Sequence, residues 1–220
     1  EIVDFYEEIQ SEDLIPDEDV IITASYSGYI KKQPLEEYKT QSRGGIGVKG
    51  TEMKEEDVVE HLFTASTHSW ILCFSNIGKI YWLKAYEIPT GSRYAKGKAI
   101  INLLKMEEGE KINAMIPIKH FDDKHFLIMI TKKGLLKKTS LDAYSRPRNG
   151  GIIAIGLRDN DELVNVRLTP GVLKFVIATK KGVAVKFDEK DVRPMGRGAT
   201  GVKGITLEKG DEVIGLEVAM

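Results

Sequence analysis

Short apolar runs separated by glycine-containing turns are the main pattern along the chain. One unit consists of an apolar run, a polar turn with a glycine, and a second apolar run that ends in basic residues. It occurs four times, at residues 20–32, 70–84, 126–138 and 175–186. Runs rich in Val, Ile, Phe and Tyr suit a half-buried strand, and glycine supplies the positive φ that a tight hairpin needs. Each unit therefore predicts a β-hairpin.

The four hairpins belong to a longer repeat. Successive turn glycines are 50, 56 and 48 residues apart; they are Gly28, Gly78, Gly134 and Gly182. After each hairpin the chain continues with an Arg/Gly loop, a third strand, an acidic turn and a fourth strand. The four Arg/Gly loops lie at residues 43–47, 93–97, 146–151 and 197–201. Self-similarity at a nearly fixed period indicates a repeat architecture.

The repeat predicts an all-β fold. No segment of residues 20–220 sustains the 3.6-residue apolar period of a helix, whereas residues 1–14 could form a partial helix or an extended lead-in. Four-stranded units of this length are typical of propeller-like blades around an axis. Such blades bury their faces only against each other, so we expect one domain over residues 20–220. The blades are expected at about residues 20–68, 69–120, 121–170 and 171–220.

The charge is divided between an acidic lead segment and a basic body. Residues 1–19 contain nine acidic residues and no Lys or Arg, in a chain whose net charge is −1. Residues 20–220 therefore hold 24 acidic and 32 basic residues, a net charge of +8. Such a body favours a polyanionic partner. We expect the lead segment to tether the domain to the remainder of a larger protein.

Basic residues recur at equivalent places of the repeat, where the hairpins end and in the Arg/Gly loops. Equivalent positions of a radial repeat fall on one rim, so these side chains could form an arc that meets the phosphates of a bent duplex with little base readout. An ordinary solvated surface is the alternative. The expected rim contacts are Lys31, Lys32, Lys49, Arg93, Lys96, Lys98, Lys137, Lys138, Arg146, Arg148, Arg197 and Lys203.

The loop at residues 41–47, with the sequence QSRGGIG, is the most informative segment. Its glycines let the backbone approach a ligand and expose N–H groups to a phosphate, and Arg43 adds a bidentate phosphate donor. A glycine-rich connector between two blades would have a similar composition. The loop is not the phosphate loop of nucleotide hydrolases, because no Gly-Lys-Ser/Thr ends it.

Catalytic and metal-binding chemistry finds little support in the sequence. Cys73 is the single cysteine, so an internal disulfide is excluded and a buried, inert thiol is expected. The four histidines lie at no metal-ligand spacing, and most tyrosines recur with the repeat as packing residues would. The longest apolar runs are too short for a membrane helix. We expect no catalytic residue, no metal and no cofactor in this domain.

Four segments resemble, in this order, the C-terminal domain of the DNA gyrase A polypeptide. They are EDLIPDEDVIITASYSGYIKK, LEEYKTQSRGGIG, THSWILCFSNIGKIYWLKAYEIP and GVKGITLEKGDEVIGLEV. The loop at residues 41–47 resembles the seven-residue gyrase box. Ser42 and Ile46 stand where that box normally carries basic residues. The residues that match the box are Gln41, Arg43, Gly44, Gly45 and Gly47.

The resemblance implies a β-pinwheel, a propeller-like disc whose blades exchange strands, with six blades usual and four repeats here. It implies that double-stranded DNA wraps around the basic rim, so that the holoenzyme introduces negative supercoils. The partners would be the remainder of the gyrase A polypeptide and the gyrase B polypeptide in an A2B2 assembly, in the bacterial cytoplasm at the nucleoid. The ATP and Mg²⁺ sites and the cleavage tyrosine would belong to other parts of the enzyme.

Two other functions fit the same pattern. The nearest is the corresponding domain of topoisomerase IV, which binds DNA but wraps it weakly. A propeller that serves as a platform for protein partners is the alternative from another class, and it predicts no salt-dependent binding to a duplex.

Overall fold

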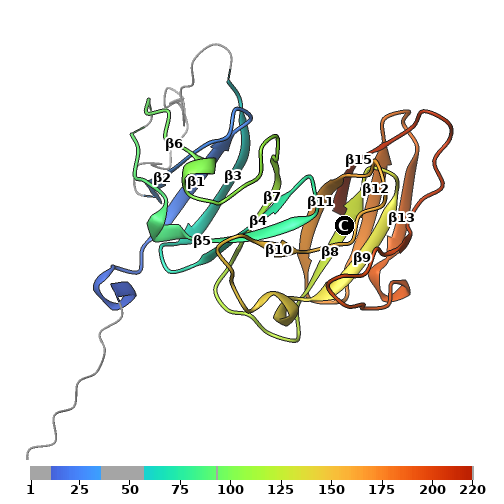
Figure 1. Cartoon of the computed structure of the whole chain (residues 1–220). Coiled ribbons are helices and arrows are strands. Elements are labelled where there is room, and N and C mark those ends of the chain that lie inside the picture. Colours follow the sequence, from blue (N-terminus) through green and yellow to red (C-terminus); the bar gives the residue numbers. More distant parts are fainter. Residues whose placement is uncertain (1–10, 36–56, 93, 220) are drawn as a thin grey trace, which may run out of the picture. The chain divides into compact units, whose positions relative to one another are not determined.

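The computed structural model describes residues 11–35, 57–92 and 94–219, and it confirms the all-β prediction (Figure 1). All regular structure in these ranges consists of β-strands and short 3₁₀-helices. A 3₁₀-helix, η1 (Ser11–Leu14), lies in the lead segment, where a partial helix was one expectation. The chain divides into two compact units, residues 1–69 with 84–98 and residues 70–83 with 99–220.

The first unit contains one antiparallel sheet, in the order β3-β1-β2-β6. The hairpin at its centre turns at Gly28, whose φ is +80°, as the sequence predicts. Its register pairs Val20 with Pro34 and Ala24 with Ile30. The strands are β1 (Asp19–Ser25), β2 (Tyr29–Pro34), β3 (Val59–Ser66) and β6 (Lys98–Ala99).

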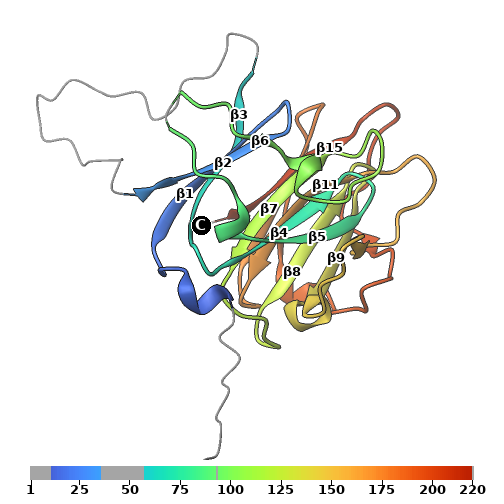
Figure 2. The same cartoon turned by 60° about the vertical axis from the view of Figure 1, so that its left-hand side comes forward.

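The second unit contains three sheets, in the orders β10-β5-β4-β7, β11-β8-β9-β14 and β13-β12-β15 (Figure 2). The strands of the first of them are β4 (Trp70–Ser75), β5 (Lys79–Lys84), β7 (Ile112–Ile118) and β10 (Ile152–Ile153). Those of the next are β8 (Phe126–Thr131), β9 (Leu135–Ser140), β11 (Leu163–Thr169) and β14 (Val202–Lys203). Those of the last are β12 (Lys174–Thr179), β13 (Ala184–Asp188) and β15 (Val213–Ala219).

The strand after each of the three described Arg/Gly loops belongs to the sheet of the preceding repeat. β10 pairs with β5 through Ile152 and Ile80, and β14 pairs with β9 through Val202 and Leu136. β6 likewise joins β2. These strands have only two residues each. Each of these hairpins is therefore completed by a segment about 70 residues further along the chain, as strand exchange between blades requires.

Two apolar cores separate the three sheets of the second unit, and β8 contributes to both. Leu127 and Met129 point into the core shared with β4, whereas Ile128 and Ile130 point into the core shared with β12. The alternation follows from the two-residue period of a strand. All four side chains are fully buried, and each contributes about 1.5–3 kcal/mol through the burial.

Short 3₁₀-helices follow the second strand of three hairpins, and a side chain of the preceding repeat binds a carbonyl oxygen of each. Trp82 donates from Nε1 to the carbonyl of Tyr144 at 3.0 Å. The Lys138 ammonium donates to the carbonyl of Glu189 at 3.3 Å. These helices are η3 (Ala85–Glu87), η5 (Leu141–Tyr144) and η6 (Glu189–Asp191).

Candidate nucleic-acid interface

Three of the lysines expected on the rim are buried, which corrects the prediction for them. Lys31 and Lys138 are each 4% exposed, and Lys137 is fully buried. Lys31 donates to the carbonyl of Ser92 at 3.0 Å. Lys137 donates to the carbonyl of Ala154 at 2.6 Å and also to that of Arg197. These ammonium groups donate to backbone carbonyls inside the protein and are not free to contact DNA. The reason is that backbone of the following repeat covers the end of each hairpin.

Lys138 and Lys32 bind the 3₁₀-helix of the repeat that follows them. Lys138 forms an ion pair of 3.2 Å with Glu189, whose side chain is fully buried. Lys32 is half-buried and donates to the carbonyls of Ala85, at 3.2 Å, and Tyr86, at 2.7 Å. Burial lowers the pKa of Lys32 from its usual value. Lys32 is thus also held by carbonyl oxygens and is only partly exposed.

The Arg/Gly loops of the second unit carry exposed basic side chains. The four basic residues predicted in or directly after these loops are all exposed, and within the described ranges none of them forms an ion pair; they are Arg146, Arg148, Arg197 and Lys203. The two loops stand at equivalent positions, each before the strand that completes the preceding sheet. The segment just beyond β10 contacts the second of these loops, since the N–H of Gly156 donates to the carbonyl of Ala199 at 3.1 Å.

The Arg/Gly loop of the first unit has the same character. Lys96 and Lys98 are exposed, and the ammonium of Lys96 lies 3.8 Å from the centre of the Tyr29 ring, a cation–π contact. Arg93 lies outside the described residues, as do the predicted box residues Gln41, Arg43, Gly44, Gly45 and Gly47 and the neighbouring Lys49.

Glycines end these loops because nothing larger fits against the preceding strand. Gly97 and Gly201 have φ of +87° and +99°, a region that L side chains rarely adopt. A Cβ on Gly97 would lie 2.4 Å from the carbonyl oxygen of Ile30, and one on Gly201 would lie 2.6 Å from that of Leu136. This close approach fixes where each basic loop leaves the sheet.

Other lysines at the hairpins have acidic partners and are less available to a polyanion. Lys79 pairs with Glu107 at 2.5 Å, and Lys180 pairs with Glu212 at 3.2 Å. The Lys180 and Lys132 ammonium groups help to hold the pKa of Glu212 below its usual value. The acidic turn of each of these repeats thus faces its own hairpin and neutralises one of its lysines.

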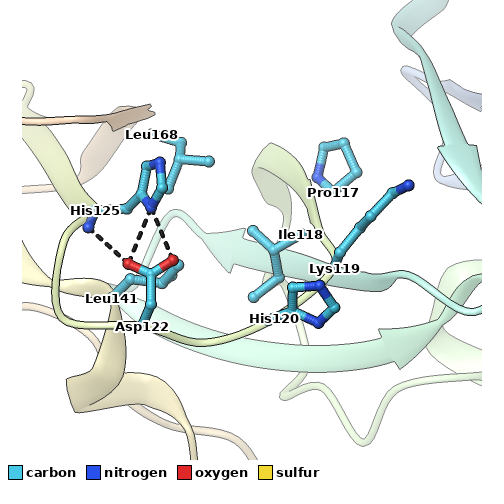
Figure 3. Close-up of a pocket in the computed structure, with 8 residues that line it drawn as sticks. All are labelled: Pro117, Ile118, Lys119, His120, Asp122, His125, Leu141 and Leu168. Atoms are coloured by element: carbon cyan, nitrogen blue, oxygen red, sulfur yellow. Dashed lines mark hydrogen bonds and ion pairs between the residues drawn. The ribbon is translucent and has the colours of Figure 1, made fainter.

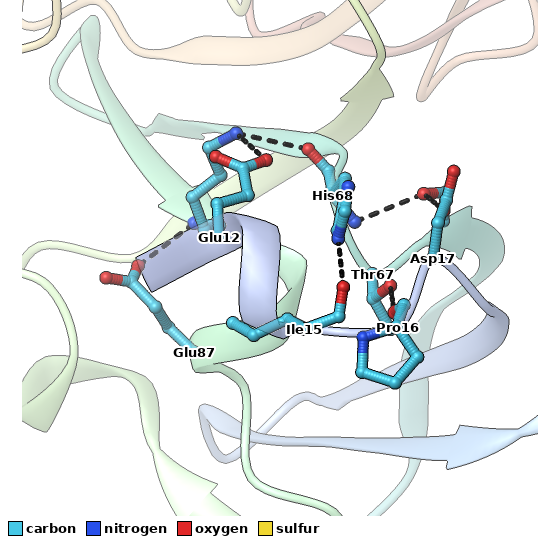
Figure 4. Close-up of polar contacts among 9 residues, drawn as sticks. Glu12, Ile15, Pro16, Asp17, Thr67, His68 and Glu87 are labelled. Atoms are coloured by element: carbon cyan, nitrogen blue, oxygen red, sulfur yellow. Dashed lines mark hydrogen bonds and ion pairs between the residues drawn. The ribbon is translucent and has the colours of Figure 1, made fainter. Parts of the chain in front are cut away.

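The end of the lead segment is bound to the first unit (Figure 4). His68 Nε2 lies 2.7 Å from the carbonyl oxygen of Ile15, and the Thr67 hydroxyl donates to that of Pro16 at 2.6 Å. Glu12 forms an ion pair of 2.8 Å with Lys84. One acidic residue of the segment therefore neutralises a lysine of the repeat.

The turn between β7 and β8 contains the histidines at 120 and 125 and forms a small pocket (Figure 3). His125 Nδ1 lies 2.8 Å from the Asp122 carboxylate. Backbone N–H groups of His125 and Lys124 and the His125 ring hold the pKa of Asp122 below its usual value. No group of three or more His, Cys, Asp or Glu in the described ranges could hold a metal. The polar contacts at this pocket are those of a turn in which the Asp122 carboxylate binds the backbone of residues 124 and 125.

Cys73 is fully buried in β4, and burial raises its pKa to about 12. The thiol is therefore not a reactive nucleophile. Among the described residues, no helix is long and apolar enough to cross a membrane.

Comparison with known protein families shows which family this repeat belongs to. The family model described as "DNA gyrase C-terminal domain, beta-propeller" matches residues 19–66, 69–119, 125–170 and 174–220. The chain belongs to the DNA gyrase C-terminal domain family. Each matched segment contains one hairpin and the fourth strand of one repeat, so the family's propeller repeat coincides with the repeat in the sequence.

Members of this gyrase family are similar over most of the chain. The DNA gyrase A polypeptide of Clostridium acetobutylicum is 51% identical over 197 residues, and that of Haemophilus influenzae is 48% identical over 200 residues. These alignments cover 90% and 91% of this chain. The chain spans about a quarter of the relatives' length, 24% and 23% respectively.

Two solved structures have the same fold. The C-terminal domain of DNA topoisomerase IV superposes with a TM-score of 0.78 at 30% identity, covering 94% of this chain and 62% of that one. The DNA gyrase A C-terminal domain superposes with a TM-score of 0.69 at 27% identity, covering 91% and 65%. The gyrase-family repeat is therefore shared with the topoisomerase IV domain at the level of backbone structure.

Proposed function

We propose that this chain binds duplex DNA without sequence specificity and wraps it along its Arg/Gly loops, as part of a DNA gyrase that introduces negative supercoils. DNA cleavage, strand passage and ATP hydrolysis would be carried out by other parts of that enzyme. Its partners would be the remainder of the gyrase A polypeptide and the gyrase B polypeptide in an A2B2 assembly, acting on the chromosome in the bacterial cytoplasm. Membership of the gyrase family supports this role.

One observation carries the proposal: consecutive repeats present exposed Arg and Lys residues at equivalent positions, without acidic partners in the described structure. Arg148 and Arg197 illustrate it, because both are exposed in Arg/Gly loops that precede the strand completing the preceding sheet. Flexible cations spaced along neighbouring sheets match the phosphates of a bent duplex, whereas reading a base sequence needs side chains in a groove. The pattern therefore favours phosphate contacts.

A salt titration tests the proposal. Binding of the chain to a duplex of about 40 base pairs would be measured by fluorescence anisotropy at several salt concentrations. If about six phosphates are neutralised, the logarithm of the association constant falls against the logarithm of salt with a slope of roughly −5. A platform for protein partners would show no binding and no such slope, which would overturn the proposal.

The domain of topoisomerase IV is the second candidate, because the solved topoisomerase IV domain superposes well on this chain. The curated relatives that match at 46–51% identity are gyrase polypeptides. A topology assay on the assembled enzyme distinguishes the two, because only gyrase would supercoil a relaxed circle in the presence of ATP. Relaxation without supercoiling would favour topoisomerase IV.

A further inference from the structure

Two buried lysines lie beneath the start of an Arg/Gly loop. Lys137 donates to the carbonyl of Arg197, the first residue of the loop at 197–201. Lys31 donates to the carbonyl of Ser92, directly before the loop at 93–97. Lys137 is fully buried and Lys31 nearly so, so neither ammonium group can reach a phosphate outside the protein.

The loops fit closely around these lysines. A Cβ on Gly201 would lie 3.3 Å from the Cβ of Lys137, and one on Gly97 would lie 3.2 Å from that of Lys31. At the other end of the first loop, a Cβ on Gly91 would lie 3.2 Å from the Cδ of Lys31. Each loop therefore packs on a lysine side chain and also accepts a hydrogen bond from it.

We propose that Lys137 and Lys31 are positioning residues for DNA binding, which hold the backbone of an Arg/Gly loop so that its exposed cations face the phosphates. This inference rests on the proposed function. In the second unit Lys137 acts through Arg197, whose side chain is exposed while its carbonyl is bound from below.

The physical basis is the strength of a hydrogen bond from a buried charged donor. The carbonyl of Ala154 also accepts from the Tyr144 hydroxyl at 3.0 Å, so loss of Lys137 weakens mainly the bond at Arg197. Desolvation, and then the charge of Arg197, lower the pKa of Lys137 to about 8. The ammonium that holds the loop therefore loses its proton at a pH where exposed lysines keep theirs.

The loop at 146–151 is an internal control. Its preceding hairpin has Tyr81 in place of the lysine, and the Tyr81 hydroxyl donates to Glu110 at 2.8 Å rather than to the loop. Removal of Lys137 should therefore leave this loop unchanged.

The first experiment needs no DNA. Amide hydrogen exchange would be compared between the 220-residue chain and its Lys137→Met variant, in which a side chain of similar length lacks the charge. We expect amides of residues 198–201 to exchange about ten times faster or more, the factor that a hydrogen bond to a charged group provides, and those of residues 148–151 to remain unchanged. Unchanged exchange at residues 198–201 would overturn the proposal.

The second experiment tests whether the position of the loop affects DNA binding. In a salt titration, Lys137→Met should reduce the magnitude of the slope by about 0.9, as Arg197→Ala does, because one phosphate contact is lost. The double variant should lose no more than either single variant, since both act on the same contact. Lys190→Met, which removes an exposed charge outside the loops, should keep the wild-type slope. Additive losses would contradict the proposal.

A pH profile separates the charge of Lys137 from a purely structural role. Between about pH 7 and 9.5, a window that brackets the lowered pKa, the affinity of the wild type should fall more steeply than that of Lys137→Met, and parallel profiles would overturn the proposal. If Lys137→Met does not fold, Lys31→Met tests the loop at residues 93–97 in the other unit. If the wild type binds no duplex, the proposed function fails, and hydrogen exchange still decides whether the lysine holds the loop.

Discussion

The ammonium group of Lys138 lies 3.2 Å from the carboxylate of Glu189, in surroundings that leave Lys138 4% exposed and Glu189 fully buried. Glu189 also accepts hydrogen bonds from the Thr169 hydroxyl, at 2.5 Å, and from the N–H of Leu173. One carboxylate thus connects η6 with the end of β11, the start of β12 and the hairpin of the preceding repeat. A lysine expected at the DNA surface instead joins two successive repeats.

Breaking this pair should destabilise the second unit strongly. Lys138→Met leaves the Glu189 carboxylate buried without its cation, so the free energy of unfolding should fall by about 3–5 kcal/mol. Chemical denaturation followed by circular dichroism would measure it. The double variant Lys138→Met with Glu189→Gln should recover part of the loss, because no charge is then left unpaired. A loss of unfolding free energy below about 1 kcal/mol, which is the range of exposed ion pairs, would contradict the burial of the Lys138–Glu189 ion pair.

Stability should rise with pH through the contribution of Lys137. Its pKa is about 8 in the folded chain, against about 10.4 for an unperturbed lysine in the unfolded chain. Between these values the unfolded state binds more protons, so the free energy of unfolding increases with pH. The gain should approach about 3 kcal/mol between about pH 7.5 and 10.5, measured as the difference between the wild type and Lys137→Met. If the difference in the free energy of unfolding between the two proteins did not change with pH, the pKa of Lys137 would not be lowered in the folded chain.

Gly201→Ala should detach β14 from β9. The φ of +99° alone costs an L residue about 1–3 kcal/mol, and the new Cβ would meet the carbonyl oxygen of Leu136. Gly210→Ala is the matched control, because Gly210 also has positive φ, +76°, but has nothing within 4 Å of an added Cβ. The thermal midpoint should fall further for Gly201→Ala than for the control, and equal shifts would argue against the close approach.

Removing a single arginine from an Arg/Gly loop should weaken DNA binding by the same factor whatever the base sequence of the duplex. Arg148→Ala and Arg197→Ala should each reduce the magnitude of the salt slope by about 0.9. Arg158→Ala, which removes an exposed arginine outside the loops, should leave the slope unchanged. A loss that depended on the duplex sequence would indicate base readout rather than phosphate contacts.

Local chemistry predicted most of the fold. The hairpin turns at Gly28, Gly78, Gly134 and Gly182 all have positive φ, because the preceding Ser or Thr and the glycine specify a tight turn within a few residues. Fourth strands such as Leu163–Thr169 follow the acidic turns, as the repeat predicts. These features depend on neighbours in sequence.

The sequence was less informative where partners are distant in the chain. Lys137 and Lys138 resemble the solvated end of a hairpin, yet their ammonium groups bind backbone of residues 154, 189 and 197. The Arg/Gly loops of the second unit were predicted correctly as exposed basic segments, while the strand after each loop joins the sheet of the preceding repeat. A lysine pair gives no sign of which distant carbonyls will surround it.

The last sheet ends at β13, whose outer edge has no paired strand among the described residues. Val185 pairs with Ile177 of β12, and the peptide groups of β13 that point away from β12 have no strand partner among the described residues. Bare strand edges invite aggregation, and a lysine on them is a common protection. The exposed Lys186 side chain places a positive charge on this edge strand, which disfavours its pairing with the edge of another copy.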